Sequence, residues 1–142
     1  MKKVLFIVPF MAVFVIGAQA QDIKSKEVPA VVKEALLKKY PKATKVSWEK
    51  EKGNYEANWG GKSGEDTSVQ FTPAGAFVEE VHAIAISQLP ANVAPYVKDH
   101  YNGAKIKEAG KVTDANGKHF FEAEIKGKDL IFDENGKFVK VD

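Results

Sequence analysis

The stretch GKDLIFDENGKFV (residues 127–139) places an apolar strand, an Asn-Gly turn and a second apolar segment one after another. An Asn-Gly pair between two apolar runs predicts a β-hairpin. The same order is found 61 residues earlier, where Val69-Gln70-Phe71 aligns with Leu130-Ile131-Phe132 and Gly75-Ala76-Phe77-Val78 aligns with Gly136-Lys137-Phe138-Val139. The recurrence of this hairpin indicates a tandem repeat.

The alignment of the two hairpins extends towards the start of each half. The aligned pairs are Pro29 with Pro90, Tyr40 with Tyr101 and, at an offset of 66 in the middle of the halves, Glu56 with Glu122. Length changes that cancel inside hairpin loops are typical of duplicated β units. We therefore predict that residues 21–142 form one domain of two repeats, at about 26–86 and 87–142.

Each half is predicted to begin with a helix, because apolar residues recur every three or four positions. The predicted core face holds Val32, Leu36 and Tyr40 in the first half and Val93 and Val97 in the second. Pro95 conflicts with a helix interior because it removes a backbone hydrogen bond. We therefore expect the second helix to kink at Pro95 or to start near Asn92.

Each predicted helix is followed by four short segments in which apolar and polar residues alternate. Such alternation is typical of an antiparallel sheet with one covered and one solvated face. The predicted fold class is α+β, with two tandem α-β-β-β-β repeats that form a largely antiparallel sheet of about eight strands and carry the helices on one face. The strand residues expected in the core are Val69, Phe71, Leu130, Phe132 and Phe138.

Residues 1–20 have the three parts of a secretory signal peptide. Met1-Lys2-Lys3 is a positive start, residues 4–16 are a mainly apolar run, and Ala18-Gln19-Ala20 is a small-x-small cleavage site. The run of 13 residues is shorter than the ~20 that a membrane-spanning helix needs. We therefore predict cleavage after Ala20 and a periplasmic or secreted protein without stable membrane insertion.

Composition narrows the range of functions further. The chain contains no Cys, and all 21 of its basic residues are Lys. Without Cys it has no disulfide, no thiol nucleophile and no lipid-anchored Cys, so we do not expect a lipoprotein. Removal of residues 1–20 leaves 19 Lys against 19 acidic residues. A neutral chain without Arg is a poor ligand for nucleic acid or for an anionic membrane.

The sequence resembles the β-lactamase-inhibitor-like, PepSY-like family of exported bacterial proteins over nearly all of residues 21–142. The resemblance rests on Tyr40-Pro41-Lys42-Ala43, on Tyr101-Asn102-Gly103-Ala104-Lys105-Ile106 and on residues 127–138. It implies a periplasmic location and two tandem α/β halves. Related PepSY domains occur in peptidase propeptides, which implies restraint of a hydrolase. No stretch matches the contact loops of the β-lactamase inhibitor itself, so no inhibitory residue is carried over.

Motifs for catalysis or metal binding are not found in the sequence. His82, His100 and His119 do not occur at metal-ligand spacing. The stretch Asp114-Ala115-Asn116-Gly117 imitates the start of a calcium loop, but Ile125 stands where that loop needs a Glu, so a hairpin turn is favoured. We therefore expect no enzymatic activity, no metal and no cofactor.

Two further groups of residues have a structural and a functional interpretation. Glu56 and Glu122 could suggest paired catalytic carboxylates, but repeat-equivalent residues on a solvated face are explained by solubility. Trp48, Tyr55 and Trp59 could form a platform for a sugar or a peptide, but their strand alternation favours the core.

Two functional hypotheses follow. The favoured one is a non-enzymatic periplasmic protein-binding module, with an inhibitor as one form, that binds another envelope protein through the open sheet face. The alternative is an envelope sensor that binds a small ligand or a metal in a cleft between the halves; a deep pocket with buried polar groups would favour this alternative. Alternation places the candidate contact residues, Asn58, Gln70, His82, Glu122 and Ile131, on the solvated face.

Overall fold

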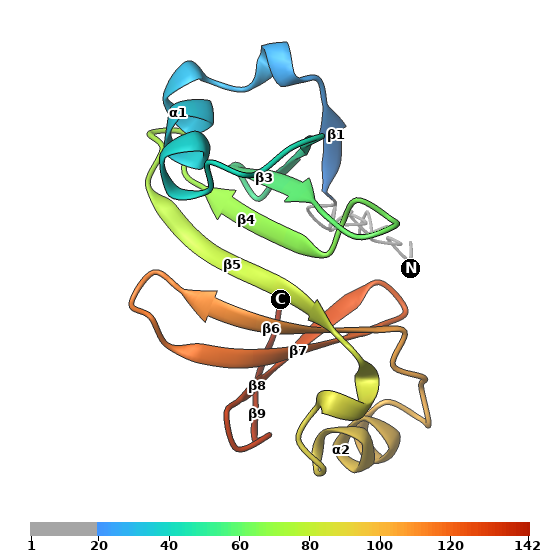
Figure 1. Cartoon of the computed structure of the whole chain (residues 1–142). Coiled ribbons are helices and arrows are strands. Elements are labelled where there is room, and N and C mark those ends of the chain that lie inside the picture. Colours follow the sequence, from blue (N-terminus) through green and yellow to red (C-terminus); the bar gives the residue numbers. More distant parts are fainter. Residues whose placement is uncertain (1–19) are drawn as a thin grey trace, which may run out of the picture.

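The computed structural model describes residues 20–142, so the predicted signal peptide lies outside the described residues except for Ala20. In this part of the chain, nine strands form one open antiparallel sheet, and their order in the sheet is their order in the sequence (Figure 1). The long strand β5 joins the two halves, and α1 and α2 lie at opposite ends of the molecule.

The elements of the two halves follow the same order. The first half contains β1 (Gln21–Ile23), the 3-10 helix η1 (Ser25–Glu27), α1 (Ala30–Lys39), β2 (Ser47–Glu51), β3 (Asn54–Trp59), β4 (Thr67–Phe71) and β5 (Phe77–Ile84). The second half contains η2 (Ile86–Gln88), α2 (Val93–His100), β6 (Glu108–Asp114), β7 (His119–Ile125), β8 (Lys128–Asp133) and β9 (Phe138–Val141). β1 is the strand that the prediction of about eight did not include.

Fine details of the halves agree, as expected for a tandem repeat. Phe71 pairs with Phe77 across a β-bulge, and Phe132 pairs with Phe138 across an equivalent bulge. The rings of these pairs are edge-on, with centroids 6.3 Å and 5.8 Å apart.

The start of α2 resolves the conflict at Pro95. The helix begins after Asn92, so Pro95 lies in the first turn, where its missing N–H has no helical acceptor.

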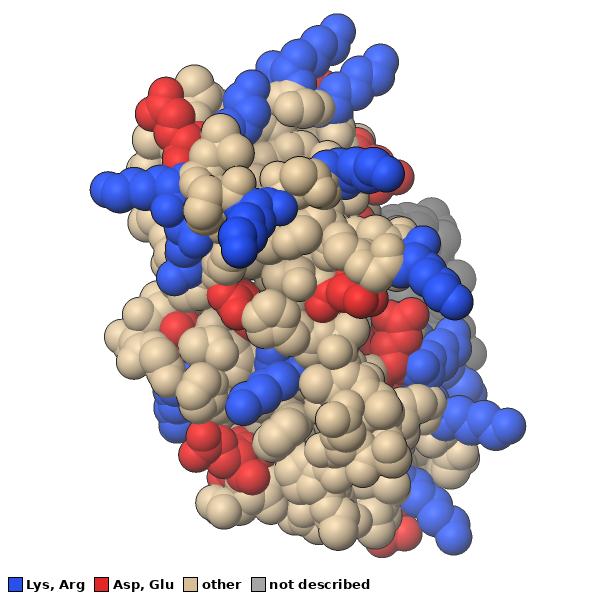
Figure 2. All heavy atoms as spheres, in the orientation of Figure 1, with Lys and Arg blue, Asp and Glu red and all other residues tan. Residues whose placement is uncertain are grey.

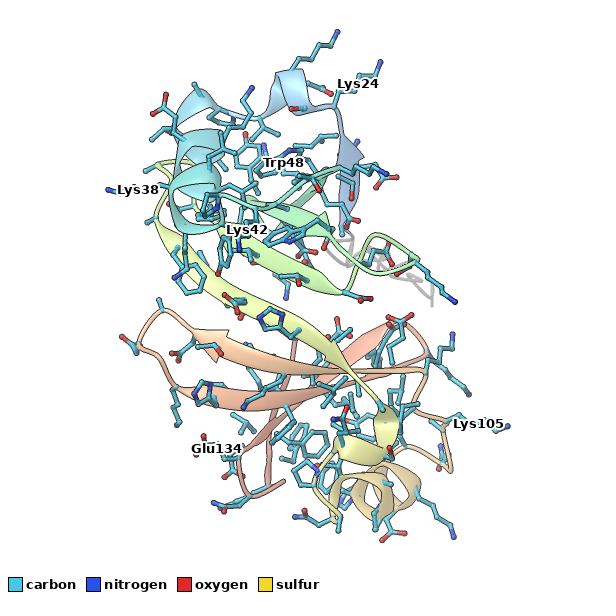
Figure 3. All side chains as sticks on the ribbon, viewed as in Figure 1. Lys24, Lys38, Lys42, Trp48, Lys105 and Glu134 are labelled. Atoms are coloured by element: carbon cyan, nitrogen blue, oxygen red, sulfur yellow. The ribbon has the colours of Figure 1, made fainter. Side chains whose placement is uncertain are left out.

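The core consists of two apolar clusters, one beneath each helix. The first contains Val28, Val32, Leu36, Trp48, Ala57, Val69 and Phe71, and the second contains Val93, Val97, Ala123, Ile125, Leu130 and Phe132. The core prediction is confirmed for eight residues, whereas Tyr40 and Phe138 pack at the cluster edges and are half-buried. Trp48 lies between α1 and the sheet (Figure 3), and Tyr55 and Trp59 pack against the same cluster, which confirms the core interpretation of these aromatic residues.

Strand register shows that both clusters use the same face of the sheet. Val69 pairs with Glu80 and Glu80 with Thr113. Two residues from Thr113 on the same strand, Lys111 pairs with Phe121. Because alternate residues of a strand share a face, the first and second clusters lie on one side of the sheet. Neither of the helices within residues 20–142 covers the other side. Among the described residues, neither helix is long and apolar enough to cross a membrane.

Candidate binding groove on the open face

The open face of the sheet is concave. Lys52, in the turn between β2 and β3, reaches the carboxylate of Asp142, which follows β9, with Nζ 2.9 Å from Oδ1. Because these two residues belong to strands near opposite edges of the sheet, their contact requires the sheet to bend around its open face. The bend creates a groove of about 530 Å³ that is lined by both halves.

The lining of the groove is strongly acidic. The first half contributes Glu49, Glu51, Glu56, Glu65 and Glu79. The second half contributes Glu108, Glu122, Glu124, Asp129 and Asp142. Among the described residues, Lys52 and Lys140 are the basic members of this lining. In Figure 2, lysine side chains project from the end of the molecule that carries α1, whereas acidic side chains lie across its middle.

Glu122 is the carboxyl most affected by this environment. It lies in β7, where it is half-buried and pairs with Gly110 on one side and Ile131 on the other. Neither neighbouring side chain can donate a hydrogen bond to it. Burial, followed by the charges of Asp129, Glu79, Glu56 and Asp142, raises the pKa of Glu122 to about 8. A carboxyl with this pKa is largely protonated at neutral pH.

Glu56, the repeat equivalent of Glu122, has a different partner. The Gln70 side-chain amide donates hydrogen bonds to Glu56 (3.1 Å) and to Glu51 (3.3 Å). The residue aligned with Gln70 in the second half is Ile131, which has no donor. This substitution within the repeat leaves Glu122 without the amide that its counterpart has.

Other carboxyls of the groove also have a pKa above the ordinary range. Burial is the largest cause for Glu49, Glu51, Glu79 and Asp129, and nearby carboxylates add to it. Asp142 is the opposite case. Burial would raise its pKa, but hydrogen bonds from Lys52 and Lys140 outweigh burial and lower it.

Asn58 is a buried polar residue on this face. It lies in β3, lines the groove and is 5% exposed. Its main-chain carbonyl accepts a hydrogen bond from Ser47 Oγ at 3.5 Å. Its side-chain amide forms no hydrogen bond with any residue from 20 to 142. The groove therefore contains an amide that can both donate to and accept from a ligand.

Four of the five predicted contact residues lie on the open face, because Asn58, Gln70 and Glu122 line the groove and Ile131 pairs with Glu122. His82 does not; it pairs with Thr67 and lies on the helix face. The prediction was wrong for His82 because Val78 is the extra residue of the bulge and reverses the alternation of β5 beyond it. Asn58 and Ile131 are also 5% exposed each, so the expectation of a solvated position is wrong for both.

The three histidines have separate local partners, and that of His119 is Thr113. His82 contacts Glu80 and Thr67, and Glu80 also accepts a hydrogen bond from Tyr40. His100 stacks on Tyr96, with ring centroids 4.0 Å apart. Within residues 20–142, no three His, Cys, Asp or Glu residues form a group that could hold a metal ion.

The calcium-like stretch is a hairpin turn, as the sequence indicated. The Asp114 carboxylate accepts hydrogen bonds from the backbone N–H groups of Asn116 (2.8 Å) and Lys118 (2.9 Å). Both bonds are accepted by Oδ1 and hold the turn between β6 and β7 closed.

Sequence reasoning missed several residues of the groove. Asp129 and Glu124 could have been found, because each is two positions from a predicted contact residue on its strand and therefore shares its face. Glu79 could not be assigned by alternation, since the bulge precedes it. Asp142 reaches the groove through the bend of the sheet, which alternation does not report.

Comparison with known proteins defines the class to which this fold belongs. Residues 15–78 and 59–140 each match the β-lactamase-inhibitor-like, PepSY-like family. The chain therefore belongs to this family, with two overlapping matches that agree with the two halves of the sheet. No curated protein matches the chain.

Several solved structures share the fold. A protein described as periplasmic from Bacteroides eggerthii is 21% identical, with a TM-score of 0.64 over 81% of this chain and 88% of its own. A DUF2874 family protein from Bacteroides uniformis is 22% identical, with a TM-score of 0.63 over 80% and 88%. A BLIP-like protein from Bacteroides fragilis is 24% identical, with a TM-score of 0.57 over 80% and 84%. At these identities the similarity shows the fold alone.

Proposed function

We propose that this protein is exported to the periplasm, is not an enzyme, and binds a segment of another envelope protein in the groove on its open sheet face. The observation that carries the proposal is the groove itself, a concave polar surface of about 530 Å³ to which both halves contribute. Concave surfaces of this size accommodate a ligand that contributes several side chains.

The comparisons support this proposal at the level of the fold. Relatives of the same architecture are described as periplasmic or as BLIP-like. The predicted signal peptide points to the same compartment. Inhibition of a hydrolase is one form that such binding could take.

Site-specific photo-crosslinking in the envelope of the source bacterium tests the proposal. Ser68, on the open face of β4, would be replaced by a photoreactive amino acid, and Leu37, which is 57% exposed on α1, would be the matched control. We expect one defined adduct from position 68 and none from position 37. Adducts from position 37 alone, or from neither position, would contradict the proposal.

A sensor for a small ligand or ion is the second candidate. It is favoured by the buried amide of Asn58 and the half-buried carboxyl of Glu122, since buried polar groups in a hollow are typical of small-ligand sites. Native mass spectrometry of the exported protein distinguishes the two. A stoichiometric small molecule or metal in the purified protein would favour the sensor, and an unliganded mass favours the protein-binding module.

A further inference from the structure

We propose that the partner segment is an extended peptide rich in lysine or arginine, and that its cationic side chains bind between Glu122 on β7 and the carboxylates of β3 and β5. This inference rests on the proposed function and specifies the chemistry of the partner. It is drawn from charge, from the ion pairs already present in the groove, and from the buried amide of Asn58.

The charge of the groove is one-sided. Within residues 20–142, ten carboxyl side chains and two lysines line it, although the chain outside the predicted signal peptide is neutral overall. Both lysines are already committed to one carboxylate, because Lys52 and Lys140 lie 2.9 Å and 3.2 Å from Asp142. No other carboxylate of the groove forms an ion pair with a residue between 20 and 142. The concentration of like charge therefore attracts a cationic partner.

The ion pairs at Asp142 show how the groove holds an ammonium group. Two lysine side chains approach the same Oδ1 atom from different elements, the β2–β3 turn and β9. Glu122 also lies on the open face, and it forms no ion pair with any residue from 20 to 142. A lysine or arginine side chain of a partner would place a positive charge beside Glu122, as Lys52 and Lys140 do beside Asp142.

The residues beside Glu122 on the open face carry no charge. The residues that precede it in the same row across the sheet are Ala83 on β5 and Gly110 on β6. A Cβ atom at position 110 would lie 2.6 Å from Cγ1 of Val81, so the packing admits only glycine there without a shift. The Val81 side chain therefore covers Gly110, and the floor of the groove next to Glu122 is uncharged.

Asn58 is the observation that distinguishes a ligand site from a solvated acidic surface. The residue is 5% exposed and lines the groove, and its side-chain amide has no hydrogen-bond partner between residues 20 and 142. Among these residues no fully buried side-chain N or O atom lacks a partner, so the accessible part of Asn58 includes its amide, which is open to the groove. A ligand that covers this amide removes it from water and must supply hydrogen bonds in exchange. A peptide backbone has the donor and the acceptor that this amide requires.

A peptide fits this arrangement better than a single ion. The carboxylates come from several strands and are spread along the groove, and the described residues contain no group of three that could hold a metal. A chain of residues can place successive cationic groups against successive carboxylates, whereas one ion contacts one cluster. The distribution of charge therefore favours an extended basic segment.

Binding of a cationic peptide is coupled to the protonation state of Glu122. The groups that face Glu122 from the other elements are Glu56 on β3, Glu79 on β5, Asp129 on β8, and Lys140 and Asp142 at β9. Their combined charge favours the protonated form of Glu122 in the empty groove. A cation at Glu122 favours the ionised form, so the protein must release a proton when the peptide binds below about pH 8.

The test measures binding of a fluorescent octapeptide of alternating glycine and lysine to the exported protein, with the glutamate version as the control peptide. We expect the lysine peptide to bind and the glutamate peptide not to bind. Glu122→Gln should weaken binding about ten-fold, the effect of losing one charge-assisted contact. Glu134→Gln is the matched control, since Glu134 is exposed in the β8–β9 turn outside the groove (Figure 3). It should change the affinity by less than about two-fold.

The pH dependence of the affinity for the lysine peptide is a second, independent test. Affinity of the wild type should rise between about pH 6 and pH 8.5, and this rise should be smaller in E122Q. If E122Q does not fold, Glu79→Gln on β5 takes its place in the comparison with E134Q.

Three results would overturn the inference. They are equal binding of the lysine and glutamate peptides, equal loss in E122Q and E134Q, and calorimetric binding of Ca²⁺ that is tighter than peptide binding and is lost in E122Q. None of them contradicts the proposed function if Ser68 still crosslinks to a partner protein. Loss of that crosslink, with lysine-peptide binding retained, would instead count against the proposed function.

Discussion

Glu122 is the residue at which pH should act most directly on stability. Its folded-state pKa of about 8 lies above the ordinary value of 4.5. A carboxyl with a raised folded-state pKa gives its full contribution below pH 4.5 and loses it as the pH rises towards 8. We therefore expect the Tm of the wild type to fall between these values by more than that of E122Q. Thermal unfolding followed by circular dichroism checks this, and parallel curves for wild type and E122Q would contradict it.

Phe71 and Phe132 are repeat equivalents in the two cores, with 1% and 0% exposure. Replacement of either by Ala leaves a cavity beneath its helix and should lower the free energy of unfolding by about 3–5 kcal/mol. Leu37→Ala, on the outer face of α1, should change it by less than about 0.5 kcal/mol. Chemical denaturation measures all three. A loss below about 1 kcal/mol for either Phe variant would mean that the core assignment of its strand is wrong.

Individual residues show where sequence patterns are informative. Alternation placed Val69, Phe71, Leu130 and Phe132 in the core, because residues two apart on a strand share a face whatever the rest of the fold does. It failed at His82, because the bulge that pairs Phe71 with Phe77 inserts one residue and exchanges the faces beyond it.

At the scale of elements, the β8–β9 turn holds α2 against the sheet. Asn92, which precedes α2, donates a hydrogen bond from its side-chain amide to the Gly136 carbonyl at 2.9 Å. A Cβ atom at position 136 would also lie 2.7 Å from Cβ of Pro90. Gly136 therefore allows a close approach that another residue would prevent.

Gly117 offers a matched control for Gly136. Both lie in Asn-Gly hairpin turns with positive φ, at 77° and 75°, but nothing lies within 4 Å of a Cβ placed at Gly117. Gly117→Ala should cost about 1 kcal/mol from backbone strain alone. Gly136→Ala should cost about 1–3 kcal/mol more, because it also displaces the start of α2. Equal unfolding free energies for the two variants would show that the turn does not support the helix.

The curvature of the sheet was not predictable from the pattern of its strands. Alternation reports which residues share a face but not whether that face is flat. The ion pair between Lys52 and Asp142, 90 residues apart, shows that the open face curves inwards. Asn58 and Ile131 are both buried on this face, although their alternation is that of solvated residues.

At the scale of the whole molecule, the predicted cleavage after Ala20 decides where the exported chain begins. Ala20 lines the groove and is followed directly by β1, so the cut would lie beside the proposed site. Intact-mass measurement of the exported protein should show residues 1–20 removed. Retention of these residues, with Gln21 still linked to Ala20, would show that the signal-peptide prediction is wrong.

Both halves must be present for the groove to exist. Each half contributes five carboxyl residues, and the bend of the sheet brings the two sets to one concave surface. The repeat explains the similar framework of the halves, while the exchange of Gln70 for Ile131 makes Glu122 chemically different from Glu56. These differences between the halves make the groove chemically asymmetric.

Titration of the lysine octapeptide into the isotopically labelled protein, followed by NMR, tests the central claim most directly. We expect the largest chemical-shift changes at Asn58, Glu79 and Glu122, including the side-chain amide of Asn58, and little change in α1 and α2. Shift changes confined to the two helices, or to the exposed lysines of the α1 end, would contradict the assignment of the concave face as the binding site.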